Sequence, residues 1–490
     1  MVETAGSGRP GRALVWSFAN TALARLGTLA ISVALARLLG PAEFGTYAVA
    51  LVALMAVLSF NELGVSLAIV RWPDDPARIA PTVATISVAM SAVLTAMAIW
   101  AAPWFTGMMG DPAATLPVQL LSLCVLVNGL VATPAALMQR AFRQDQRLVA
   151  DQVNTWVGAL VSIALAAAGL GALALVVGRL AGAALSGLLF WHYSPLPYRF
   201  GLDRELARRL LAFGVPLAGA SMVVFAVGFL DQLVVGRVLG PASLGAYVLA
   251  VNLAAWPVTL LSLPLRAVAP ALFARMQHDP ARMHRAYGQV QRPLAAVALP
   301  GCVAIAACAP QLVAVVYGEA WSAAGPVLRW LALFAALRIG FELCYDYLVV
   351  LGRTRAVLRV QLAGLVALVP AVWLGLREAS LAGAGAALVA VAVGVTLPLY
   401  LVELRRAGLG PGPVLSAWAA PAVAAVPAAG VPLALTAAGS SDLAVLLVGG
   451  TFSAALAAAL LRWRRGDLAV WRLQDGTDER TEPVPAADPR

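Results

Sequence analysis

The chain has 490 residues, of which 61% are hydrophobic and 12% are charged, whereas an ordinary soluble domain is about 45–50% apolar and about 25% charged. Its 34 basic residues are all arginine, and the 24 acidic residues leave a formal net charge of +10. This composition has too few charges to cover a soluble globule. The arginines lie singly or in small groups at the ends of apolar blocks, which argues against a nucleic-acid-binding face.

Fourteen apolar blocks follow a polar N-terminal tail, residues 1–12, and each is long enough to cross the roughly 20-residue hydrocarbon core of a bilayer. The first block is too long for the core of a signal peptide, so we expect a retained helix. The first six spans are expected near residues 13–38, 45–70, 79–102, 115–138, 148–169 and 171–192. The other eight are expected near residues 210–238, 244–272, 293–316, 326–350, 356–376, 380–402, 413–437 and 442–461.

Polar segments separate these spans. Residues 194–209 are expected to form a cytoplasmic linker between lobes, and residues 462–490 a cytoplasmic tail that is partly disordered. Leucines and arginines in residues 203–213 alternate as in an interfacial helix. Asp279 and Pro280 form a cap-and-proline pair that predicts the start of a short helix.

The distribution of arginine predicts the topology. If the N-terminus is cytoplasmic, the cytoplasmic segments hold 26 arginines and the outer loops hold four, with four more inside spans. Positive charge that flanks apolar spans stays on the cytoplasmic side. The sequence therefore predicts a multi-pass membrane protein with both termini in the cytoplasm.

An internal repeat indicates how the spans are organised. Residues 36–50, ARLLGPAEFGTYAVA, align without gaps with residues 236–250, GRVLGPASLGAYVLA, and eight of the fifteen positions are identical. In each copy a Gly-Pro pair is typical of a helix stop followed by a tight turn. The repeat unit holds six spans, so both copies begin on the same side of the membrane. We therefore expect an all-α membrane protein with two six-helix lobes, residues 13–193 and 210–402, related by a parallel repeat, and two further helices in residues 413–461.

Four stretches resemble bacterial polysaccharide flippases: LARLLGPAEFGTYAVALV, NELGVSLAIVR, FLDQLVVGRVLGPASLGAYVLA and LPLRAVAPALFARMQHDPARM. They are similar to Wzx-type O-antigen and exopolysaccharide repeat-unit flippases of the MOP superfamily, which have a MATE-like fold. The resemblance implies movement of a polyprenyl-pyrophosphate-linked oligosaccharide from the cytoplasmic to the outer leaflet by alternating access. It also implies a polysaccharide polymerase and glycosyltransferases as partners.

Two arginines inside spans are candidate ligands for the pyrophosphate. Arg25 lies near the middle of the first span, roughly 18 Å from either end at about 1.5 Å per residue. Its planar guanidinium can hold two phosphate oxygens. Arg266 lies near the cytoplasmic end of its span, where it would receive phosphate early. The alternatives are an interhelical ion pair for Arg25 and snorkelling to the interface for Arg266.

Three charged residues in the span 326–350 are candidates for the wall of a hydrated cavity. Arg338, Glu342 and Asp346 stand at i, i+4 and i+8, which places them on one helical face. A charge in the hydrocarbon core costs from about 2.5 to above 10 kcal/mol, so this face is expected to meet water or a partner. Pairing of Arg338 with Glu342 is the simpler interpretation, and the two are compatible.

Glu62 and Asp231 are the candidate sites for a coupling ion, because a buried carboxylate that binds H⁺ or Na⁺ changes the free energy of one conformation. Asp231 alternatively holds the two lobes in register. Arg179 follows Gly178, which is spaced as GxxxG with Gly182 and favours close helix packing. The four cysteines are expected to pack as small apolar groups.

The sequence contains no enzymatic motif. Its three histidines lack metal-ligand spacing, a Walker motif is impossible without lysine, and no GxSxG or dinucleotide fingerprint occurs. We therefore expect a transporter rather than an enzyme, without a metal or other cofactor and with lipid-linked oligosaccharide and membrane lipids as partners. A cation-coupled multidrug or small-molecule exporter on the same fold and a membrane-embedded glycosyltransferase or polymerase are the alternatives.

Overall fold

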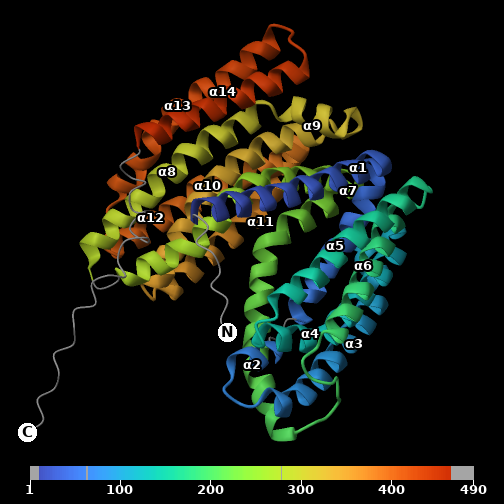
Figure 1. Cartoon of the computed structure of the whole chain (residues 1–490). Coiled ribbons are helices and arrows are strands. Elements are labelled where there is room, and N and C mark those ends of the chain that lie inside the picture. Colours follow the sequence, from blue (N-terminus) through green and yellow to red (C-terminus); the bar gives the residue numbers. More distant parts are fainter. Residues whose placement is uncertain (1–9, 62–64, 277–278, 465–490) are drawn as a thin grey trace, which may run out of the picture. The chain divides into compact units, whose positions relative to one another are not determined.

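The computed structural model describes residues 10–61, 65–276 and 279–464, with side chains from residue 30 onward except at a few positions. This part of the chain is helical and contains no strand (Figure 1). The helices are α1 (Pro10–Asn61), α2 (Val65–Arg71), α3 (Pro76–Met108), α4 (Thr115–Arg140), α5 (Gln144–Ala167), α6 (Ala172–His192), α7 (Arg204–Arg275), α8 (Pro280–Ala307), α9 (Ala309–Tyr317), α10 (Ala324–Val350), α11 (Thr354–Val391), α12 (Leu397–Arg406), α13 (Pro411–Ala437) and α14 (Asp442–Trp463).

These helices account for the predicted spans. Eleven helical segments of the described chain are long and apolar enough to cross a membrane. The segment Arg204–Ser262 continues past Gly240 and, at 59 residues, is long enough for two spans. Helix α1 as a whole has 52 residues with a turn at Gly40 and is also long enough for two, and the 27-residue α10, which is not among the eleven, has the length of one more. The backbone turns at these two glycines, whose φ angles are 72° and 80°, a region that side chains with a Cβ rarely adopt. The predicted Gly-Pro turns are confirmed.

Side-chain caps set where two helices begin. The Asp203 carboxylate accepts a hydrogen bond from the backbone N–H of Leu206 at 3.1 Å, and α7 continues unbroken from there into its first span. The Asp279 carboxylate accepts one from the backbone N–H of Arg282 at 3.0 Å. The two short cytoplasmic helices expected from the sequence are therefore the first turns of α7 and α8, because no residue after either cap interrupts the helix.

The chain forms two compact units. Unit 1 comprises Met1–Ala246 and Val316–Trp321, and unit 2 comprises Tyr247–Val315 and Ser322–Arg490. Within unit 1, α3 packs on α4 and α5 packs on α6; within unit 2, α8 contacts α10, α13 and α14 (Figure 1). These units follow packing rather than the sequence repeat, so the lobe boundaries drawn from the repeat stay a prediction.

Three aromatic side chains pack together in the core of unit 2. The ring of Tyr347 on α10 lies 5.1 Å from that of Tyr287 on α8 and 5.5 Å from that of Phe273 on α7, between ring centroids. All three side chains are fully buried. By contrast, Trp100 on α3 is 85% exposed and Val423 on α13 is 73% exposed. Large apolar side chains that face outward in this way are typical of a lipid-facing surface.

The two copies of the sequence repeat contact each other within unit 1. A Cβ placed on Gly45 would lie 2.0 Å from the backbone oxygen of Pro241, and one placed on Gly245 would lie 2.6 Å from that of Pro41. The two Gly-Pro turns therefore approach backbone to backbone, in a reciprocal arrangement. We call this contact the repeat junction.

The arginine that both copies share makes equivalent bonds on either side of the repeat junction. Nε of Arg37 donates to the carbonyl oxygen of Val316, which lies at the end of α9, at 2.9 Å. Arg237 donates from Nη1 to the carbonyl oxygen of Met108 at the end of α3. Each copy thus holds the end of a helix from the other half of the chain.

Candidate functional site

Helix α10 carries the charged stripe that the sequence singled out. Nε of Arg338 lies 3.3 Å from Oε1 of Glu342, so these two side chains form an i, i+4 ion pair. The Arg338 side chain is 56% exposed, the Glu342 side chain is 18% exposed and Asp346 is buried at 5%. The stripe therefore passes from the surface of unit 2 into its core. Pairing of the first two charges, the simpler interpretation, is present in the structure.

Aromatic side chains surround the buried end of this stripe. Tyr400 on α12 is buried, and its ring stacks on that of Phe341 with centroids 5.5 Å apart. Glu342 and Asp346 lie near enough to the Tyr400 hydroxyl to interact with it electrostatically. The polar part of α10 is thus enclosed by rings on one side and leaves the Arg338 guanidinium accessible on the other.

A cavity of about 540 Å³ lies within unit 1, between α1, α4, α5 and α6. Four spans thus line a partly open volume in the range of small-ligand sites, about 300–1,000 Å³. Apolar side chains line part of it, and its polar lining includes Asn128, Asp151, Asn154, Thr155, Arg179 and Ser186. A polar cavity of this size at membrane depth is a candidate binding site.

Close packing of α5 on α6 fixes the direction of the Arg179 side chain. A Cβ on Gly178 would lie 2.5 Å from the backbone oxygen of Gly158, and one on Gly182 would lie 2.4 Å from that of Asn154. The packing role expected for this GxxxG stretch is confirmed. Arg179 itself also lines the cavity, which was not predicted from the sequence. The pattern that could have indicated it is the i+7 spacing of Arg179 and Ser186, which places both side chains on one helical face.

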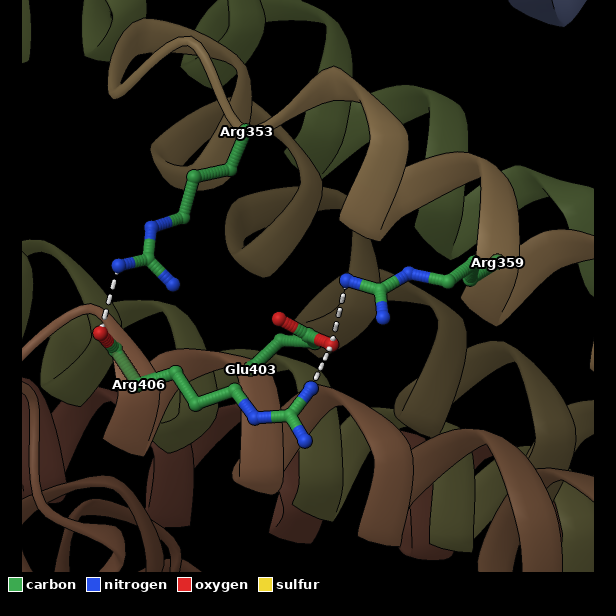
Figure 2. Close-up of polar contacts among 4 residues, drawn as sticks. All are labelled: Arg353, Arg359, Glu403 and Arg406. Carbon is green, nitrogen blue, oxygen red and sulfur yellow. Dashed lines mark hydrogen bonds and ion pairs between the residues drawn. The ribbon is translucent and has the colours of Figure 1, made fainter.

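A second cluster of charge, shown in Figure 2, was not anticipated from the sequence. The Glu403 carboxylate, on a side chain only 8% exposed, lies 3.2 Å from Nη2 of Arg359 and 2.8 Å from Nη1 of Arg406. Arg353 donates to the backbone carbonyl of Arg406 at 2.6 Å. One buried carboxylate therefore ties the start of α11 to the end of α12. The i, i+3 spacing of Glu403 and Arg406 was the only local signal.

Of the four remaining candidate residues from the sequence, the structure describes the side chain of Asp231 alone. The side chains of Arg25, Glu62 and Arg266 lie outside the described residues. Asp231 lies in α7, half-buried and beside the buried Gln232. The described residues contain no group of three metal-ligating side chains, and the four cysteines, which all lie in the described part, are buried and unbridged.

Comparison with known proteins identifies the family. Residues 34–326 match the family described as polysaccharide biosynthesis protein. The succinoglycan biosynthesis transport protein ExoT of Rhizobium meliloti is 28% identical over 71% of each chain. The lipopolysaccharide biosynthesis protein WzxC of Escherichia coli is 24% identical over 66% of each chain.

Solved structures confirm the fold. The lipid II flippase MurJ, in an inward closed conformation, superposes with a TM-score of 0.73 at 11% identity, over 92% of this chain and 99% of that one. An inward-facing multidrug resistance MATE family transporter of the MOP superfamily gives 0.59 at 15% identity, over 78% and 94%. The expected all-α MATE-like fold is therefore correct. With its family match extending over more than half of its length, this chain belongs to the polysaccharide biosynthesis protein family.

Proposed function

We propose that the chain moves a polyprenyl-pyrophosphate-linked oligosaccharide from the cytoplasmic to the outer leaflet of the bacterial inner membrane, for surface polysaccharide biosynthesis. It does so by alternating access and without chemical conversion of the substrate. Membership of the polysaccharide biosynthesis family supports this proposal, as does a relative named as a transport protein for succinoglycan. The fold shared with a lipid II flippase supports the lipid-linked class of substrate.

The accessible guanidinium of Arg338 is the observation that carries the proposal. Within unit 2, this cation sits on a span-length helix and is more than half exposed, although Glu342 offers it a partner. A charge on a membrane helix is expensive unless it meets water or another charged group. An anionic lipid headgroup on a hydrated path supplies both.

The other charged candidates are assigned complementary roles in this proposal. Arg25 and Arg266 hold pyrophosphate oxygens at two depths in the membrane. Glu342 and Asp346 keep the substrate path along α10 hydrated. Glu62 or Asp231 binds H⁺ or Na⁺ and so couples an ion gradient to the conformational change. No cofactor beyond that ion takes part.

The orientation of the chain in the membrane follows from the distribution of its positive charge. With both termini in the cytoplasm, the Glu403 cluster and the start of α7 face the cytoplasm, and the repeat junction faces the outer side. Glycosyltransferases that complete the lipid-linked unit supply the substrate on the cytoplasmic face. A polymerase that joins the units consumes the product on the other face.

Gene deletion with complementation tests the proposal. Cells that lack the chain should accumulate lipid-linked repeat units with cytoplasmic glycan, and the wild-type chain should restore surface polysaccharide. The Arg25→Ala variant should reduce export about tenfold or more at normal protein level. Deletion without accumulation of lipid-linked units would refute the proposed substrate. Loss of drug efflux in the deletion strain, without accumulation of lipid-linked units, would favour the alternative function of a small-molecule exporter.

A further inference from the structure

The cavity of unit 1 contains a cation, Arg179, that the described side chains around it do not neutralise. In the described part of the chain, no hydrogen bond or ion pair joins the Arg179 guanidinium to another residue. Asp151, the one acid among the described lining residues, lies 3.8 Å from Nε of Arg147 instead. Arg179 is about 10 Å along α6 from its first residue, at about 1.5 Å per residue. An arginine at this depth without a counterion is a functional-site hypothesis by default.

The geometry of α6 makes Arg179 part of the cavity wall. Gly178 and Gly182 face α5 at backbone contact distance, so the neighbouring stripe of α6 is turned away from α5. That stripe, Arg179, Ala183, Ser186 and Phe190, lines the cavity at i, i+4, i+7 and i+11. The guanidinium is therefore presented to the cavity by rigid helix packing rather than by a loop.

The rest of the lining is suited to a sugar ring. The amides of Asn128 and Asn154 carry both donors and acceptors. The hydroxyls of Thr155 and Ser186 donate to backbone carbonyls of their own helices, at 3.1 Å each, and their oxygens can still accept a hydrogen bond. Sugar hydroxyl groups need both kinds of partner. The aromatic ring of Phe190 adds an apolar surface for the C–H face of such a ring.

The charge of the cavity distinguishes between two anionic groups. Among the lining residues that the structure describes, Arg179 is the single cation and Asp151 is the single acid. A planar carboxylate carries one negative charge and matches the two parallel donors of a guanidinium. A pyrophosphate carries more negative charge than one guanidinium can balance beside an acid. The arrangement thus favours a sugar carboxylate over the lipid phosphate.

We propose that this cavity binds an acidic sugar of the transported glycan, with its carboxylate on Arg179. The inference rests on the proposed function, because it names the class of glycan that the transporter selects. The chain would then prefer uronate-containing or otherwise carboxylated repeat units to neutral ones.

Ligand binding to the purified full chain in nanodiscs tests this inference. Saturation-transfer NMR would compare methyl glucuronide, methyl glucoside and inorganic pyrophosphate. We expect the glucuronide to bind at least about tenfold more tightly than the glucoside, and Arg179→Gln to remove that preference. Arg329→Gln, which changes an exposed arginine on α10, is the matched control and should retain it.

A second variant tests the same site in case the Arg179→Gln variant does not fold. Ala183→Leu fills the cavity beside Arg179 without removing the cation, so it should also abolish glucuronide binding. Equal binding of glucoside and glucuronide, or a preference that survives both variants, would overturn the inference. Displacement of glucuronide by pyrophosphate at lower concentration would assign Arg179 to the lipid phosphate instead.

The transport assay separates this inference from the proposed function. If lipid-linked glycan is flipped normally by the Arg179→Gln variant whether or not the glycan is acidic, the acidic-sugar site is wrong and the flippase stands. If the wild-type chain binds glucuronide but does not flip any lipid-linked glycan, the proposed function is wrong and the site stands.

Discussion

Glu403 shows how one buried carboxylate organises several cations. Its two guanidinium partners, Arg359 and Arg406, are 65% and 58% exposed, so solvent screens each ion pair. We expect Glu403→Gln to lower the free energy of unfolding by about 1 kcal/mol, measured by scanning fluorimetry in detergent. Glu319→Gln, which alters an exposed carboxylate that has no ion pair in the described chain, is the control. Equal midpoints for the two variants would contradict this role.

The ion pair on α10 allows structure and transport to be separated at single residues. Exchanging the charges, with Arg338→Glu and Glu342→Arg together, preserves an i, i+4 pair and should leave the thermal midpoint close to that of the wild type. Export should still fall about tenfold or more, because the cation has moved by one turn. The measurement is polysaccharide export at matched protein level. Normal export by the exchanged pair would show that the two charges serve only to pair.

The sequence predicted residues whose spacing along one helix carries the signal, such as Arg338 with Glu342. It did not predict the contact of Glu403 with Arg359, because those residues come together only when α11 packs beside α12. For Arg179 the GxxxG pattern indicated helix packing correctly. Which direction the neighbouring side chain takes depends on α1 and α4, and the local pattern holds no information about them.

At the scale of elements, the repeat junction is the tightest backbone approach that the repeat produces. Gly45→Ala would place a methyl group 2.0 Å from the backbone oxygen of Pro241, and overpacking of this kind costs about 1–3 kcal/mol. We expect a lower unfolding midpoint for Gly45→Ala by scanning fluorimetry. Gly228→Ala on α7, where a Cβ would meet nothing within 4 Å, should be neutral or stabilising. An unfolding midpoint for Gly45→Ala equal to that of Gly228→Ala would show that the backbones at the repeat junction can move apart without a loss of stability.

Helix number and turn positions could both be predicted, because each depends on apolar length or on Gly-Pro pairs visible in the sequence. The capping residues Asp203 and Asp279 were placed correctly at helix starts, but the helices that follow them were expected to be short. The polar first turns continue into apolar spans because no residue there breaks the helix. The reciprocal contact of the two turns required the tertiary structure.

At the scale of the whole molecule, the arginine distribution predicts which loops face the cytoplasm. All four natural cysteines are buried, so introduced cysteines should dominate labelling by a membrane-impermeant maleimide in intact cells. We expect Ala438→Cys, between α13 and α14, to be labelled from outside. Asp145→Cys, at the start of α5, should be labelled only after permeabilisation. Both positions are exposed. The reverse pattern would invert the topology.

Translocation by the purified chain is the central claim, and proteoliposomes that contain a polyprenyl-pyrophosphate-linked oligosaccharide test it most directly. The measurement is the fraction of glycan that a membrane-impermeant glycosidase can cleave from outside. We expect this fraction to rise with time in vesicles that contain the chain, under a proton or sodium gradient, and to stay constant in protein-free vesicles. An accessible fraction that does not differ between the two kinds of vesicle under either gradient would contradict it.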